Sequence, residues 1–295
     1  MRLVHFMLST GKIRLGALDG DNIIDLNSHA NWVPIDLVRF LHEHENAYEK
    51  LKLVAADPLN TIYPVDRVHL MPPIQGPDKI LGIAHNYSDY CDEKQIEYPS
   101  EPIVFNRFAS TIIGPYDRIK HPTCSKAVEW EVELVVVMGK IARNVKAANA
   151  FDYVFGYTAA QDLTATDWMS KSGGQYVLCK NMDHFCPIGP CLVTKDEIPD
   201  PHNLFAKTWV NGVLKQNGNT RNLLFKIDEL IEHLSSVLTL LPGDLICTGT
   251  PSGVGETRSP PEFLKPGDVL TSEIEGVGKL KNYVVDYESH IILKL

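Results

Sequence analysis

The chain has 295 residues, enough for one large domain or for a small domain beside a medium one with a full hydrophobic core. Hydrophobic residues make up 44% and charged residues 22%, the composition of a folded globular protein and not of a disordered one. The net charge is −9 and lysines and arginines are not clustered, so we expect neither nucleic acid nor an anionic membrane as a partner.

Targeting and redox signals are weak. No apolar stretch reaches the length of a membrane span, and the N-terminus reads as a first strand and not as a secretory or organellar leader. The cysteines lack the CxxC spacing of zinc or redox motifs, which favours reduced thiols inside a cell. They are Cys91, Cys124, Cys179, Cys186, Cys191 and Cys247.

The first 78 residues predict a small N-terminal unit. Residues 1–30 hold two strand-like runs around a "DGDN" turn, and residues 34–56 carry apolar side chains at helical spacing behind Pro34. Residues 57–78 are rich in proline and read as a linker. We therefore expect a small α/β domain with its linker over residues 1–70 and the main domain over residues 71–295.

From residue 79 onward, short strand patterns alternate with turns. The predicted strands cover residues 79–84, 101–108, 129–139, 155–163 and 204–218, the last with an Asn211-Gly212 hairpin turn, and a further hairpin region covers 266–287. One clear helix is predicted late in the chain, over residues 226–240. The fold class is therefore mixed β/α and mainly β.

The segment "EWEVELVVVMGK" (129–140) carries an unusual row of acids. On a strand, Glu129, Glu131 and Glu133 share one face. A solvated face would explain them, but Val135 and Val137 continue the same face into an apolar interior. Buried carboxylates repel one another and are costly to desolvate unless they are protonated or bind a cation.

A hard divalent ion is the natural partner of such oxygen ligands, with Mg²⁺, Mn²⁺ and Ca²⁺ as candidates. A third ligand should come from another apolar strand. The best candidate is Asp162 in "GYTAAQDLTATDW". A structural network of buried ions, without a metal, stays open as an alternative.

Seven stretches between residues 82 and 255 together resemble the fumarylacetoacetate hydrolase superfamily. In order they are "GIAHNYSDYCDE", "EPIVFNRFASTIIGP", "EWEVELVVVMGK", "GYTAAQDLTATDW", "CKNMDHFCPIGP", "VNGVLKQNGNT" and "PGDLICTGTPSGVG". The resemblance spans most of residues 79–285. It implies a rolled β-sheet domain of mixed β/α type that follows a small N-terminal domain, in a protein that assembles as a homodimer.

The resemblance also implies a metal site. Glu131, Glu133 and Asp162 match the family's ligands of one divalent cation, Mg²⁺ or Mn²⁺ with Ca²⁺ possible, and Glu129 matches a supporting position. A small 2-oxo acid then chelates the ion, and the reaction passes through a metal-stabilised enolate.

Two further residues match the family's substrate contacts. Lys180 in "CKNMDHF" matches an active-site lysine, and Thr250 in "TGTP" matches a residue that binds the substrate carboxylate. From the sequence alone, Lys180 could equally be a surface lysine and Thr250 a turn residue. Arg107 in "VFNRF" retains a cation at a position that is often lysine, and we expect it to bind substrate.

One motif departs from the family. Members that hydrolyse or decarboxylate carry a His-x-x-Glu pair that activates water, whereas "NYSDYCDE" keeps Glu93 but has Tyr90 at the histidine position. Tyrosine titrates near a pKa of about 10 and is a poor base at neutral pH. Tyr90 could itself donate a proton. His85 could compensate, although a lone histidine at a strand end is commonly structural.

These features favour a metal-dependent enzyme acting on small 2-oxo acids, with Lys180, Glu93 and Tyr90 as catalytic residues. We expect an oxaloacetate keto–enol tautomerase, which is an isomerase, because tautomerisation needs no hydrolytic water. The alternatives are a hydrolase that cleaves C–C bonds of acylpyruvates or diketo acids, and a catalytically silent dimeric scaffold. The resemblance implies a mitochondrial location, with the cytoplasm as the alternative.

Overall fold

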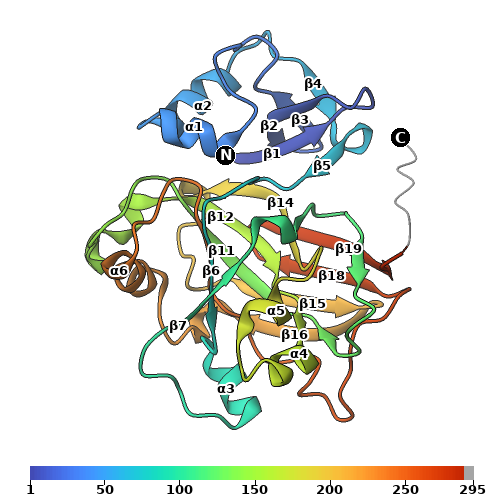
Figure 1. Ribbon diagram of the computed structural model, residues 1–295. Helices are drawn as coiled ribbons and strands as arrows, with labels where there is room; N and C mark the ends of the chain where they lie inside the picture. The colour runs from blue at the N-terminus through green and yellow to red at the C-terminus, as the bar shows by residue number, and fades with distance from the viewer. Residues whose placement is uncertain (289–295) are drawn as a thin grey trace.

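The structure is a computed structural model that describes residues 1–288. The N-terminal unit forms one end of the molecule, above the larger body in the view of Figure 1. Its strands are β1 (Arg2–Met7), β2 (Ile13–Asp19), β3 (Asn22–Asp25), β4 (Ile62–Pro64) and β5 (His69–Met71), and its helices are α1 (Leu37–Glu43) and α2 (Ala47–Ala55).

The body is built mainly of strands. They are β6 (Ile80–Ala84), β7 (Ile103–Arg107), β8 (Ile112–Ile113), β9 (Ile119–His121), β10 (Val128–Glu129), β11 (Val132–Met138), β12 (Val154–Gln161), β13 (Thr164–Ala165), β14 (Cys186–Thr194), β15 (Phe205–Val210), β16 (Val213–Asn219), β17 (Leu245–Cys247), β18 (Val269–Ile274) and β19 (Gly278–Asp286). The helices are α3 (Ser88–Lys94), α4 (Thr166–Lys171), α5 (Tyr176–Lys180) and α6 (Ile227–Val237). The mainly β prediction is confirmed.

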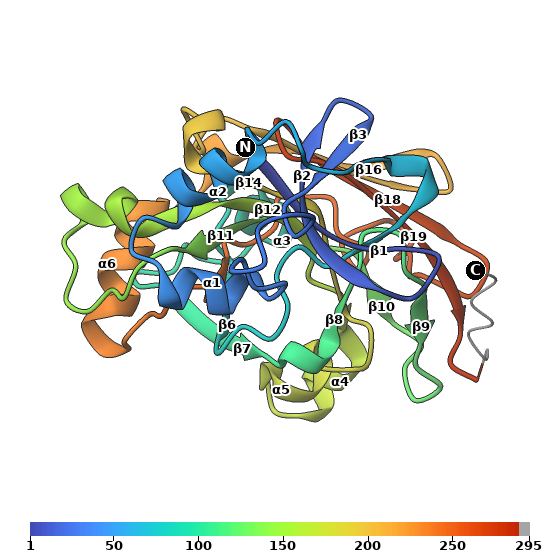
Figure 2. The same ribbon diagram turned by 90° about the horizontal axis from the view of Figure 1, so that it is seen from above.

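Two sheets make up most of the fold (Figures 1 and 2). A twelve-stranded sheet has the order β4-β3-β2-β1-β14-β12-β11-β17-β6-β7, with β5 paired to β1 and β8 to β14. A five-stranded sheet has the order β16-β15-β18-β19-β9. The large sheet runs from the N-terminal unit into the body, because β1 pairs antiparallel with β14.

The N-terminal unit shares a core with the body. Leu3 and Leu15 pack in one apolar cluster with Val135 and Leu192 of the central strands. The division expected at residue 70 stays a prediction, and the two parts are joined by strand pairing as well as by the chain.

The N-terminal elements differ in detail from the predicted ones. The helix expected over residues 34–56 is two helices, since the backbone is extended at His44 after α1. Asp36 caps α1 by accepting hydrogen bonds from the amides of Val38 (2.9 Å) and Arg39 (3.2 Å). The segment 57–78 is more than a linker, because β4 and β5 find partners on the edges of β3 and β1.

The central strands β11 and β12 are buried along both faces, as strands inside a layered fold must be. Val135 and Val137 pack in one apolar cluster, and Leu134 and Val136 in another. Glu133 stands opposite Ala160 in the ladder between the two strands. The acid-bearing ends of both strands therefore lie side by side.

Later elements follow the sequence closely. Asn211 and Gly212 have φ of 53° and 79°, the left-handed pair that a tight hairpin turn requires, and the predicted β15–β16 hairpin is confirmed. The helix expected over 226–240 is α6, which buries Leu230, Ile231 and Leu234. Among residues 1–288, no helix combines the length and apolar character needed to cross a membrane.

Candidate metal and substrate site

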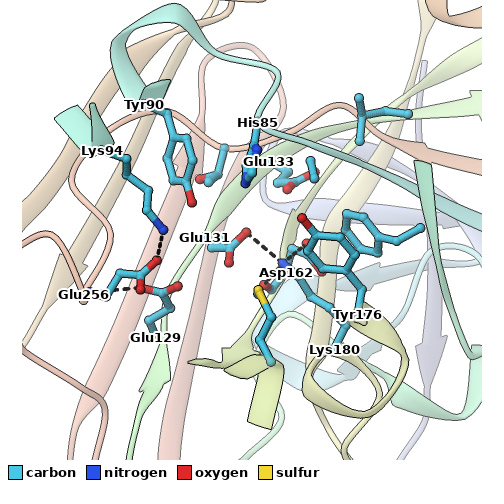
Figure 3. A pocket seen from close by; sticks show the side chains of 15 residues that line it. His85, Tyr90, Lys94, Glu129, Glu131, Glu133, Asp162, Tyr176, Lys180 and Glu256 are labelled. Carbon is cyan, nitrogen blue, oxygen red and sulfur yellow. Dashed lines mark hydrogen bonds and ion pairs between the residues drawn. The ribbon is translucent and has the colours of Figure 1, made fainter. Parts of the chain in front are cut away.

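A small cavity lies where β11 begins and β12 ends, beneath α3, and it offers about 40 Å³ to a water-sized ligand (Figure 3). Its wall is rich in polar and charged side chains. These are His85, Tyr90, Lys94, Glu129, Glu131, Glu133, Asp162, Tyr176, Lys180, Thr250 and Glu256. The cavity is therefore narrow and polar.

Three acids form the centre of this wall. One carboxylate oxygen each of Glu131, Glu133 and Asp162 lies within 4.8 Å of the other two, and all three residues are buried. Strand pairing brings them together, because the Asp162 amide donates to the Glu131 carbonyl oxygen at 2.8 Å just beyond the β11–β12 ladder. The structure thus assembles the three ligands expected from the sequence.

Lys180 reaches the same acids from α5. Its Nζ lies 2.9 Å from Glu131 Oε2 and 2.5 Å from Asp162 Oδ2, and its side chain is only 3% exposed. Such short charge-assisted contacts are the strong members of the hydrogen-bond family. Lys180 is therefore a buried partner of the acids and lines the cavity, not a surface lysine.

Arg107 lies behind the acids instead of facing the cavity. Its Nη1 contacts Asp162 Oδ1, and its Nη2 donates to the Phe185 carbonyl at 2.6 Å. The guanidinium is completely buried and is absent from the cavity wall. This position suits Arg107 for orienting Asp162, and it does not bring Arg107 to the place where we expected it to bind substrate.

Two acids of the site have raised pKa values because they are buried. Burial is the main cause that raises the pKa of Glu133 to about 8, although its carboxylate accepts a hydrogen bond from the Gly249 amide at 2.9 Å. Burial and the nearby charges of Glu131 and Glu256 raise the pKa of Glu129 to about 8. A cation in the cavity would relieve this cost.

The charges of the site fit a divalent ion. Four buried carboxylates, those of Glu129, Glu131, Glu133 and Asp162, stand against two buried cations, Lys180 and Arg107. With every group ionised, the site carries two more negative charges than positive ones. All three central donors are oxygen atoms, which hard divalent cations prefer. The donor set therefore fits a metal of this class.

Helix α3 closes the cavity and carries two of the expected catalytic residues. Tyr90 is buried and lines the cavity, and burial raises the pKa of its hydroxyl well above the usual value. Glu93 lies outside the cavity wall. Its carboxylate accepts hydrogen bonds from the Gly253 amide (2.8 Å) and the Thr257 hydroxyl (2.9 Å), so it ties α3 to the following loop.

Thr250 lines the cavity with its hydroxyl already engaged. The hydroxyl donates to the Val132 carbonyl at 3.0 Å and accepts from Gln216 Nε2 at 2.8 Å. Its position beside the acids agrees with a place near a bound substrate.

Sequence reasoning missed the outer wall of the cavity. Lys94 pairs with Glu256, whose amide donates to Glu129 Oε2 at 3.0 Å. Tyr176 of α5 stacks on Phe105 with ring centroids 5.0 Å apart. Lys94 and Glu256 lie 162 residues apart, and no spacing or periodic pattern in the sequence connects them.

Comparison with known proteins agrees with this site. Residues 79–285 match the family model described as fumarylacetoacetate (FAA) hydrolase C-terminal. The chain belongs to the fumarylacetoacetate hydrolase family. It is 47% identical to oxaloacetate tautomerase fahd2, mitochondrial, from Xenopus laevis, over 97% of this chain and 90% of that relative.

Solved structures share the fold over nearly the whole chain. A putative HpcE protein from Mycobacterium smegmatis superposes with a TM-score of 0.86 at 35% identity, covering 97% of this chain and 99% of that one. Maleylpyruvate hydrolase from Sphingobium sp. SYK-6, solved with manganese(II) and pyruvate, gives a TM-score of 0.79 at 33% identity with the same coverage. The fold predicted from the resemblance is confirmed, and the chain is an enzyme of this family.

Proposed function

We propose that this protein is a divalent-metal-dependent enzyme that interconverts the keto and enol forms of oxaloacetate. The observation that carries the proposal is the buried triad of Glu131, Glu133 and Asp162 with Lys180 bonded to two of its members. The Xenopus laevis relative, named an oxaloacetate tautomerase, supports the choice of substrate.

Different residues of the cavity would bind the metal ion and the 2-oxo acid. Glu131, Glu133 and Asp162 would hold the ion, which supplies Lewis acidity toward the keto oxygen when bound. Lys180 offers an ammonium group to the substrate carboxylate or to negative charge that develops on the keto oxygen. Tyr176 and Phe105 form an aromatic side of the cavity next to Lys180, whose Nζ lies 5.0 Å from the Phe105 ring.

The roof of the cavity favours isomerisation over hydrolysis. A hydrolase must activate a water molecule with a general base. The raised pKa of Tyr90 keeps its hydroxyl protonated, so that it is not available as a base, and the Glu93 carboxylate is bonded to the loop outside the cavity. A tautomerase activates no water and needs only a group that moves one proton of the substrate.

The decisive experiment follows the ultraviolet absorbance of enol-oxaloacetate with added Mn²⁺ or Mg²⁺, with excess chelator, and with Asp162→Ala. We expect acceleration that disappears in chelator and in the variant, while the exposed control Asp21→Ala on the β2–β3 turn keeps it. If metal binds without acceleration and the protein cleaves acylpyruvates, the hydrolase hypothesis replaces the tautomerase hypothesis. If the protein neither binds metal nor accelerates the reaction, the catalytically silent scaffold is the hypothesis that remains.

The metal that we propose is Mg²⁺ or Mn²⁺. Both accept octahedral oxygen ligands, which suits three carboxylates with room for substrate oxygens. The manganese(II) in the Sphingobium maleylpyruvate hydrolase supports an ion of this class. Metal analysis of protein purified without added metal, followed by calorimetry with each ion, would identify it.

We further propose a homodimer formed through the face that β7 and α5 share. Strand β7 is the last strand of the large sheet, and Asn181 joins it to α5 by donating to the Asn106 carbonyl at 3.2 Å. Residues on and beside these two elements leave large apolar side chains exposed, which a partner subunit could cover. They are Ile103, Val104, Phe108, Val177 and Leu178. Light scattering would report a dimer and, for Leu178→Glu, a monomer.

The location that we propose is the mitochondrion. The Xenopus laevis and human relatives carry that word in their names, the human one at 43% identity over 97% of this chain and 92% of its own length. Fractionation of cells that express the natural protein would test the assignment, since recovery in the cytosolic fraction alone would contradict it.

A further inference from the structure

His85 occupies a strained and rigid position at the end of β6. Its φ of 55° is in the left-handed region, which costs free energy for a residue with a side chain and is common at functional sites. Asn86 fixes the backbone directly after it. The Asn86 amide group donates to the Thr248 carbonyl at 2.8 Å and accepts from the Phe225 amide at 2.8 Å.

The imidazole of His85 projects into the cavity beside Tyr90 (Figure 3). The two rings stack with centroids 5.8 Å apart and planes inclined by 25°. Lys94 Nζ lies 5.5 Å from the centroid of the same Tyr90 ring. The stack fixes the plane of the imidazole while its edge remains directed toward the acid-lined space.

Both ring nitrogens of His85 are free for a ligand. Among the contacts of residues 1–288, neither nitrogen makes a hydrogen bond or an ion pair, although the backbone carbonyl of His85 accepts one from Cys91 Sγ at 3.4 Å. Burial, with the nearby charge of Lys94, lowers the pKa of the imidazole. A neutral imidazole has one nitrogen that accepts a proton and one that donates.

We propose that His85 is a catalytic residue that carries the proton between the methylene carbon and the keto oxygen of the substrate. This inference rests on the proposed tautomerase function. In the keto-to-enol direction, the C–H bond breaks and its electron pair becomes the C=C π-bond. The π-electron pair of the C=O bond moves to the oxygen. His85 takes the proton from carbon and returns it to that oxygen, so no other reactant is consumed.

The other polar groups of the cavity are less suited to this transfer. Lys180 directs its side-chain nitrogen at Glu131 and Asp162 and already contacts both carboxylates. Tyr90 supports the imidazole by stacking and therefore acts as a positioning residue. Glu129 is the remaining competitor, because its carboxyl group lines the cavity and its pKa is about 8.

The test compares His85→Gln, His85→Ala and Glu129→Gln in the Mn²⁺-loaded enzyme. We expect His85→Gln to slow enol-oxaloacetate decay by roughly 10²–10⁴-fold, the usual contribution of a general acid–base group. Mn²⁺ affinity, measured by calorimetry, should stay within about threefold of wild type, because His85 is not one of the three acids. Added imidazole should restore part of the rate of His85→Ala. The exposed His42→Gln on α1 serves as the control.

A second readout measures the wild-type protein and uses His85→Gln only to assign its signals. In ¹⁵N-histidine-labelled enzyme, oxalate, a planar mimic of the enol, should shift the ring signals that His85→Gln removes. Unshifted signals, or a His85→Gln rate equal to wild type, would overturn the proposal. If only Glu129→Gln slows the reaction, Glu129 and not His85 carries the proton. If the wild-type protein does not accelerate enol-oxaloacetate decay, the proposed function itself fails. This outcome is seen before any variant is made.

Discussion

The floor and the roof of the cavity are built by different means. The floor consists of acids on and just before β11 and just beyond β12, beside an antiparallel ladder that keeps its register from Val132 to Val137. The roof is the seven-residue helix α3, held by side chains that bond to the 252–257 loop. Backbone ladders are hard to distort, whereas side-chain contacts to a loop break individually. The floor is therefore suited to holding a fixed ion, and the roof to admitting and covering a substrate.

The largest effect is expected in the floor. Lys180→Met removes two buried ion pairs and leaves Glu131 and Asp162 without that cation. We expect the free energy of unfolding in chelator to fall by about 3–5 kcal/mol, as when one partner of a buried pair is removed. Saturating Mn²⁺ should recover much of the loss, since the ion neutralises the same acids. Denaturant titrations with and without metal would measure both values.

The matched control is Lys171→Met, because Lys171 is 60% exposed and its contact to Asp167 is long at 3.9 Å. It should change stability by no more than about 0.5 kcal/mol. Equal losses in the two lysine variants would mean that the buried pairs do not stabilise the floor.

An intermediate effect is expected from pH. In the folded protein, Glu129 and Glu133 bind protons up to a pKa of about 8, whereas their ordinary value is 4.5. Between these values the folded state holds more protons than the unfolded state. The free energy of unfolding in chelator should therefore fall as the pH rises from 4.5 to about 8. Added Mn²⁺ should stabilise the protein more at the upper end of this range.

Thermal melts at several pH values, in chelator and in Mn²⁺, would check this prediction. Glu133→Gln should flatten the chelator curve, because it removes one of the two titrating groups. A melting temperature in chelator that rises with pH across this range would contradict the raised pKa values.

The smallest effect is expected in the roof. Glu93→Gln keeps the shape of the side chain but weakens its contacts to Gly253 and Thr257. Because Glu93 is an exposed residue, we expect a loss of about 1 kcal/mol or less in stability, with Mn²⁺ affinity unchanged. The exposed Glu97→Gln is its control. If Glu93→Gln abolished tautomerase activity with its fold intact, Glu93 would act inside the cavity, as the sequence suggested.

The same division explains what the sequence could predict. The alternating acids of residues 129–133 and the apolar run behind them are a local pattern, so the floor, the central strands and the three carboxylates were foreseeable. The hairpin at Asn211-Gly212 was foreseeable for the same reason. The places of Arg107 behind Asp162 and of Glu93 outside the cavity depend on contacts between distant segments. No periodicity encodes such contacts, and only the folded chain reveals them.

The narrowness of the cavity, about 40 Å³ for a water-sized ligand, has a kinetic consequence. A four-carbon diacid is considerably larger than a water molecule. We therefore expect each turnover to include an outward movement of α3, whose side-chain bonds to the 252–257 loop can break one at a time. This movement sets an upper limit on how fast substrate is captured and product escapes. A ligand caught beneath the closed helix should accordingly show a long residence time relative to its size.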